Sequence, residues 1–144
     1  MSQDLPNYPF IIIGALIAVL CAFAVQRYKS KGDAARFFRE GVIDELVGFY
    51  PPPGKWRKGF EGQLAIAMAS IEVRVKKFRQ YVPRRKLRGY DSTWKDLKIH
   101  CSDLTWEKCA AYTMYPSMRT DDDKDPKEMF YEKIEKLLTY AREA

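Results

Sequence analysis

The hydrophobic pattern opens with an uninterrupted apolar run from Phe10 to Val25, sixteen residues that read FIIIGALIAVLCAFAV. Adding Gln26 and the two residues before the run gives nineteen. At a rise of about 1.5 Å per residue, a helix of that length is close to the thickness of a bilayer core. We therefore predict a transmembrane helix over residues 10–26, preceded by a short extracytoplasmic tail over residues 1–9.

A cleaved signal peptide is the main alternative for this run, because Ala22-Phe23-Ala24 resembles a small-residue cleavage site. A signal peptide starts with a basic region, however, and the first nine residues contain no Lys or Arg. A buried core helix is the third reading, and it is disfavoured because the run has no polar face.

Basic residues follow the apolar run at once and predict its orientation. Arg27, Lys29 and Lys31 lie in a juxtamembrane linker over residues 27–32, whereas no basic residue precedes the run. Positive charges concentrate on the cytoplasmic side of membrane helices. We expect the N-terminus to lie outside and residues 33–144 to form a cytoplasmic domain.

Two segments behind the anchor carry apolar residues at helical spacing. The first follows an expected break at Gly32, has Asp33 as its N-cap and stops at the proline run 51–53. Its apolar face comprises Ala35, Phe38, Val42, Leu46 and Phe49. The second ends at Pro83 and carries a heptad-like stripe, which a bundle core explains and a homodimeric coiled coil would explain as an alternative. The stripe consists of Phe60, Leu64, Met68, Ile71, Val75, Phe78 and Val82.

Further helices are predicted downstream. We expect a basic link over residues 84–88 and then a third helix capped by Asp91. The buried side of this helix comprises Trp94, Leu97 and Cys101. A short helix falls within residues 103–115, and a capping box from Asp125 to Glu128 starts the last helix. The apolar face of the last helix comprises Phe130, Ile134, Leu137, Leu138 and Ala141. No strand pattern competes, so the fold class is all-α, a single N-terminal transmembrane helix plus a soluble bundle of about four helices.

The segments AARFFREGVIDEL, VRVKKFRQYVP and RRKLRGYDSTWKDL follow one another in this order. In this they resemble a loose group of small uncharacterised bacterial inner-membrane proteins with one N-terminal transmembrane helix and a helical cytoplasmic domain. The matching positions are Ala35 to Arg39, Phe78 to Val82, and Tyr90 with Trp94, where Tyr90 replaces the commoner Phe. The resemblance covers residues 33–100 and implies a bacterial inner-membrane setting, without implying an activity.

Charge is unevenly distributed along the expected domain. Residues 55–88 hold eleven Lys and Arg against two Glu, a net charge of +9, whereas residues 101–144 hold seven basic and ten acidic residues, a net charge of −3. The two halves can neutralise each other, or they can leave a basic surface that anionic lipid attracts at about 1 kcal/mol per nearby cation. The candidate contacts to lipid or to a partner are Trp56, Arg57, Lys58, Arg74, Lys77, Arg84, Arg85 and Arg88.

Candidate chemistry is sparse. His100 is the only histidine, and it would need Cys101, Cys109 and Asp103 to complete a zinc site, although adjacent helical residues point about 100° apart. The acidic run 121–125 lacks the alternating ligands and the central Gly of a calcium loop. We therefore expect no catalytic, metal or cofactor site, and free thiols in a reducing compartment.

These features favour a membrane-anchored, non-catalytic interaction module. It would be an accessory component that docks on a membrane protein or complex, with its basic face toward anionic phospholipid. A membrane-tethered nucleic-acid-binding protein is the first alternative, although the basic residues at 84–88 accompany no recognised nucleic-acid motif. An enzyme with an unrecognised pocket around His100, Asp103 and Tyr112 is the second alternative.

Overall fold

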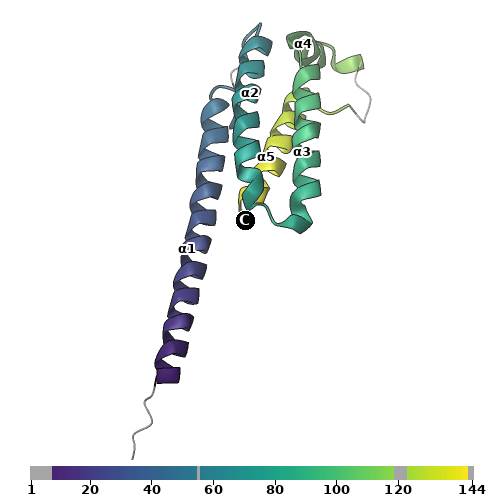
Figure 1. The fold of residues 1–144 in the computed structure, drawn as a ribbon. Helices are drawn as coiled ribbons and strands as arrows, with labels where there is room; N and C mark the ends of the chain where they lie inside the picture. The colour runs from purple at the N-terminus through teal and green to yellow at the C-terminus, as the bar shows by residue number, and fades with distance from the viewer. Residues whose placement is uncertain (1–7, 55, 119–122, 143–144) are drawn as a thin grey trace, which may run out of the picture. The chain divides into compact units, whose positions relative to one another are not determined.

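The computed structural model describes residues 8–54, 56–118 and 123–142, and every regular element within these ranges is helical (Figure 1). The elements are α1 (Tyr8–Glu45), α2 (Glu61–Phe78), the short 3-10 helix η1 (Arg79–Tyr81), α3 (Arg84–Asp103), α4 (Trp106–Met114), the short 3-10 helix η2 (Pro116–Met118) and α5 (Pro126–Arg142). The all-α prediction is confirmed, with one long apolar N-terminal helix followed by a helical domain. The chain divides into two compact units, Met1–Asp33 and Ala34–Ala144.

The first unit contains the apolar part of α1. Every large apolar side chain between Phe10 and Val25 is more than half exposed, from 53% for Ile13 to 75% for Phe10. The span is long and apolar enough to cross a membrane, and none of it is buried. Such dense apolar exposure is unfavourable in water, so it fits a lipid-facing helix and not the core helix of a soluble bundle.

α1 continues through Gly32 and Asp33 without interruption, so the predicted helix break and the predicted N-cap at Asp33 are both wrong. A glycine inside a helix costs only about 1 kcal/mol relative to alanine, and the alanines that follow at 34 and 35 favour helix. The next proline along the chain is Pro51, so no residue near Gly32 removes a backbone donor from the helix.

The core of the second unit is built from apolar stripes on α1, α2 and α5. All seven members of the predicted stripe from Phe60 to Val82 are buried, and so are the five predicted residues between Ala35 and Phe49. Phe38 of α1 stacks on Phe78 of α2 with ring centroids 4.5 Å apart. On α5 the buried residues are Phe130, Ile134, Leu137 and Leu138, with Ala141 partly buried against them. The helical spacing of apolar residues therefore predicted most of this core.

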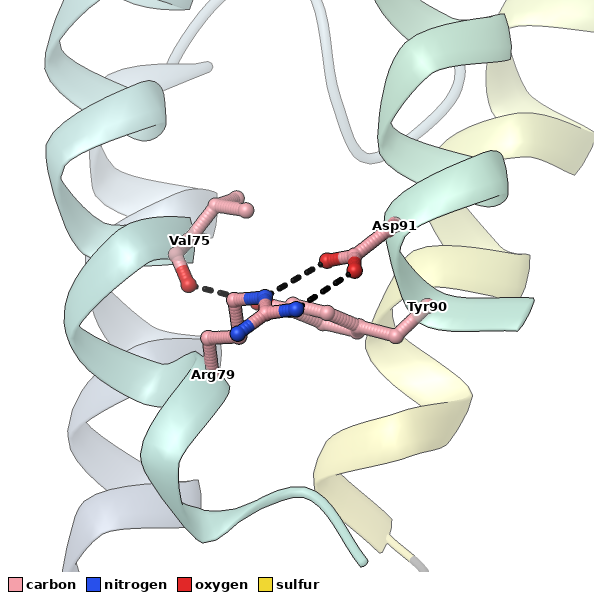
Figure 2. A network of polar contacts seen from close by, with 4 residues as sticks. All are labelled: Val75, Arg79, Tyr90 and Asp91. Carbon is pink, nitrogen blue, oxygen red and sulfur yellow. Dashed lines mark hydrogen bonds and ion pairs between the residues drawn. The ribbon is translucent and has the colours of Figure 1, made fainter. Parts of the chain in front are cut away.

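α3 begins eight residues earlier than predicted, because the basic segment 84–88 is its first turn and a half and not a link. Pro83 stands in the N-cap position, where its missing donor costs nothing because helix N-termini have unpaired N–H groups. Asp91 lies inside the helix and accepts two hydrogen bonds from the Arg79 side chain, at 2.9 and 2.8 Å (Figure 2). The predicted cap at Asp91 is therefore wrong.

The last two α-helices begin with side-chain caps. The Thr105 hydroxyl accepts a hydrogen bond from Lys108 N at 3.3 Å and starts α4. The Asp125 carboxylate accepts one from Lys127 N at 2.9 Å, which confirms the predicted N-cap of α5. α5 packs along α3, and the His100 ring near the end of α3 lies 2.9 Å from the carbonyl oxygen of Pro126.

Tyr90 joins the four long helices of the second unit. Its ring is fully buried on α3, and its neighbours are Phe38 of α1 at 6.4 Å, Phe78 of α2 at 6.1 Å and Tyr140 of α5 at 5.3 Å between ring centroids. Its hydroxyl donates a 3.0 Å hydrogen bond to the carbonyl oxygen of Val75 (Figure 2). Burial of the ring raises the pKa of the Tyr90 hydroxyl, which keeps it a neutral donor at any physiological pH.

We expect Tyr90→Phe to lower the free energy of unfolding by about 0.5–1.5 kcal/mol, because the Val75 carbonyl still accepts a hydrogen bond from Arg79 N. Tyr90→Ala should cost about 3–5 kcal/mol, because it removes a buried ring that contacts three other helices. Denaturant titration of the full-length protein in detergent micelles measures both values. Equal losses for the two variants would show that the hydrogen bond, and not the ring, carries the contribution of Tyr90.

Candidate interaction surface

The predicted contact residues fall into three groups. Trp56 is only 7% exposed, packs edge-on against Phe60 and Phe130, and donates a 3.0 Å hydrogen bond from its indole nitrogen to the Tyr131 hydroxyl. This burial argues against the predicted contact of Trp56 with the bilayer or a partner. Its neighbours Gly54 and Arg57 are typical of an exposed loop, but this loop folds over α5 through contacts some 75 residues away in sequence.

The remaining candidates lie at two ends of the second unit. Arg57 and Lys58 are exposed just before α2 begins, whereas Lys77 and the α3 arginines stand where α2 ends and α3 begins. α2 has eighteen residues, which separates the two groups by about 27 Å along the helix. A contact confined to one end of α2 would therefore engage only one of the two groups.

Arg74 forms an ion pair inside the second unit. Its guanidinium lies 3.0 Å from the Glu45 carboxylate, and its side chain crosses α1 at Gly41. A Cβ atom at Gly41 would collide with the Arg74 guanidinium, so the absence of a side chain there makes room for this ion pair. Because Arg74 already has a carboxylate partner, it contributes less free positive charge than its neighbours.

The exposed cations on either side of the α2–α3 connection are Lys77, Arg84, Arg85 and Arg88, which we call the basic corner. Within the described ranges, none of these four has a carboxylate within ion-pair distance. Arg79, in the middle of the connection, differs because Asp91 holds it in a 2.8 Å ion pair (Figure 2). The hydrogen bonds between Asp91 and Arg79 lower the pKa of Asp91 and raise the pKa of Arg79. The pair therefore stays ionised at neutral pH.

The basic corner lies at the end of the second unit where the chain enters it. Ala34, the first residue of this unit, lines the same groove as Gln80 and Tyr81 of η1, in the connection from α2 to α3. The stacked rings of Phe38 and Phe78 fix this arrangement one turn further along. The end of α2 is therefore next to Ala34, where the chain enters the folded unit, and Tyr90 of α3 lies 6.4 Å from Phe38 between ring centroids.

α2 also exposes an apolar face that sequence reasoning did not single out. Ile66 is 71% exposed and Val73 is 53% exposed, and Gly62, Ala65 and Ala69 lie exposed on the same side of the helix. The spacing 62–66–69–73 was a readable signal, because it places apolar residues at helical intervals opposite the core stripe. The small residues leave backbone and Cβ atoms accessible between the two larger side chains.

The groups considered for chemistry do not converge. No cluster of three or more His, Cys, Asp or Glu able to hold a metal occurs within the described ranges. The His100 ring bonds the backbone of α5, and Cys101 and Cys109 are free thiols. A groove of about 330 Å³ between α2 and α3 includes Cys101, but His100, Asp103 and Tyr112 do not line it. Residues 121 and 122 of the acidic run lie outside the described residues.

Comparisons of the chain with protein-family models, with curated proteins and with solved structures find no match.

We expect the Cys101 thiol to react slowly with alkylating reagents. Burial raises the pKa of Cys101 to about 12, so near pH 8 its thiolate fraction should be on the order of 1,000-fold below that of an ordinary exposed thiol. Peptide-level mass spectrometry after timed iodoacetamide labelling measures the rate, and the denatured protein supplies the reference. A rate in the folded protein equal to the denatured rate would contradict the burial of Cys101.

Proposed function

We propose that this chain is a membrane-anchored, non-catalytic interaction module. The apolar part of α1 holds it in a bacterial inner membrane with the N-terminus outside, and the helical unit from Ala34 onward lies on the cytoplasmic side. The basic corner faces anionic lipid, while the helical faces dock on a membrane protein or complex. The chain acts as an accessory component of that partner.

The observation that carries this proposal is the position of the basic corner at the chain-entry end of the folded unit. Ala34 follows Gln26, at the end of the apolar span, by only eight positions along the chain. Eight helical residues span about 12 Å, and even a fully extended chain of that length spans less than about 30 Å. The tether therefore keeps the entry end of the unit close to the lipid headgroups.

The charge at this end is sufficient to orient the unit. An anionic leaflet attracts each nearby Lys or Arg with about 1 kcal/mol, and the attraction decays over a Debye length of about 8 Å. The four cations of the basic corner have no carboxylate partner within the described ranges, so their charge is available to lipid phosphates. The same cations would attract nucleic acid, but the short tether holds them beside the bilayer.

The basic corner should bring α3 to the headgroups in proportion to the anionic lipid present. In the variant Ser92→Cys, a fluorophore marks α3 four residues after Arg88, at an exposed position. Full-length protein in phosphatidylcholine nanodiscs should show stronger quenching by headgroup nitroxides when phosphatidylglycerol is added. Changing Arg84, Arg85 and Arg88 to Gln should weaken the association by about 3 kcal/mol, roughly 100-fold.

The matched control is Arg57→Gln with Lys58→Gln, which removes two exposed cations from the opposite end of α2. This control should leave the quenching unchanged. Equal effects of the two variants would show that total charge, and not the basic corner, governs the signal. Quenching that is indifferent to phosphatidylglycerol, together with salt-dependent binding of DNA or RNA, would favour the nucleic-acid alternative.

A stoichiometric membrane-protein partner should copurify with the full-length protein in mild detergent. Substitutions at the exposed α2 residues Ile66 and Val73 should disrupt this protein–protein contact. A charged side chain there would lose its hydration in an apolar interface and find no opposite charge. We expect Ile66→Glu or Val73→Glu to reduce the copurified partner at least about ten-fold, and Gln63→Glu, also exposed on α2, to have little effect. Quantitative mass spectrometry of the purified material provides the measurement, and the absence of any stoichiometric protein would contradict an accessory role.

A further inference from the structure

We propose that the groove between α1 and α2 beside the basic corner binds the phosphodiester headgroup of one anionic phospholipid. This inference rests on the proposed function, because it names the ligand that the lipid-facing end of the unit would hold. We call this feature the entry groove; it contains Ala34, Phe37 and Phe38 of α1, and its other wall runs from Arg74 to Tyr81.

The floor of the entry groove is aromatic. Phe38 and Phe78 stack at 4.5 Å with their ring planes 11° apart, and Tyr81 continues the stack from Phe78 at 6.2 Å. Both phenylalanines are almost fully buried, so the core holds the floor in place. The groove has a volume of about 280 Å³, just below the range of about 300–1,000 Å³ that is usual for drug-sized ligands. It suits a headgroup and the adjoining glycerol, and it is too small for a whole lipid.

The charge of the groove favours an anion. Its lining contains two cationic side chains, Lys77 and Arg74, and no carboxylate. Arg74 is shared with Glu45 at 3.0 Å, whereas Lys77 is exposed and has no ion-pair partner within the described ranges. The ammonium of Lys77 is therefore the group that would bind the phosphodiester, as a flexible point charge.

The mouth of the groove identifies the anion as part of a lipid. Phe37 stands there 63% exposed, beside Ala34, although an aromatic side chain in water is unfavourable. An apolar ring next to a cation matches an amphiphile, whose phosphate meets Lys77 while its glycerol and first methylenes meet Phe37. Aromatic residues are enriched at this depth of a bilayer, and the tether from Gln26 to Ala34 keeps the groove within its reach. A free phosphate ion would gain nothing from Phe37.

The test uses full-length protein in phosphatidylcholine nanodiscs with a small fraction of phosphatidylglycerol that carries a diazirine near its glycerol. After illumination, mass spectrometry locates the lipid adducts on the chain. We expect adducts at residues 34–38 and 77–81 with photoactivatable phosphatidylglycerol, and far fewer with photoactivatable phosphatidylcholine. Lys77→Gln should lower the groove adducts about five-fold, and Lys77→Arg should retain them.

Lys76→Gln is the matched control, because Lys76 is one residue away and its ammonium already pairs with Glu72 at 3.2 Å. It should leave the adducts unchanged. Phe37→Ser provides a second variant at an exposed position, and it should lower adduct formation while the helical content, measured by circular dichroism, stays the same. Competition by inorganic phosphate as effective as competition by phosphatidylglycerol would overturn the assignment to a lipid.

The fluorescence signal at Ser92→Cys separates the two levels of the proposal. Phosphatidylglycerol-dependent quenching without groove adducts, or with adducts indifferent to Lys77→Gln, would overturn the headgroup site and leave the lipid-facing role standing. Loss of both signals would overturn both. A protein crosslinked at residues 34–38 in native membranes, in place of lipid, would also overturn the inference.

Discussion

Tyr90 connects the four long helices of the folded unit, and the position of the basic corner depends on this connection. The ring contacts α1, α2 and α5 from α3, while the hydroxyl ties α3 to the last turns of α2 through the Val75 carbonyl. One residue further along, Asp91 binds Arg79 across the same α2–α3 connection. Together these contacts fix the direction in which α3 leaves α2, and so they determine where Arg84, Arg85 and Arg88 emerge.

The same packing explains how the positive charge of residues 55–88 is distributed. Three of its cations are neutralised by nearby carboxylates: Arg74 pairs with Glu45, Lys76 with Glu72 and Arg79 with Asp91. These carboxylates lie in the first two thirds of the chain and not in its acidic C-terminal part. The exposed cations Arg57 and Lys58 stand at one end of α2, and the larger group, the basic corner, stands at the chain-entry end. A short tether and an unpaired cluster at that end together favour a contact with lipid.

The continuity of α1 changes how the anchor and the folded unit are connected. The sequence predicted a linker over residues 27–32 between the apolar span and the folded unit. In the structure these residues are helical, and the same helix supplies Phe37 and Phe38 to the entry groove. Two residues that line the groove thus follow the apolar span by only a few helical turns. The proposed headgroup site therefore depends on the proposal that this end of the unit faces lipid.

The sequence by itself determined the apolar span, the helical fold class, the core stripes of α1, α2 and α5, and the cap at Asp125. These features depend on periodicity and on side-chain to backbone contacts within a few residues, which a linear pattern contains. The sequence did not determine the start of α3 or the burial of Trp56. Local signals at Asp91 favoured a helix cap, and those around Gly54 favoured an exposed loop. In the structure, however, Asp91 binds Arg79 and Trp56 binds Tyr131, and neither partner could be read from the local sequence.

The candidate site divides in the same way. Composition and spacing identified the basic residues, yet nothing in their order indicated which ones Glu45, Glu72 and Asp91 would neutralise. The entry groove depends on Phe38 meeting Phe78, forty residues further along the chain. Such pairing is set by how the helices pack, because only the packed helices decide which of several apolar and charged faces is covered and which remains open.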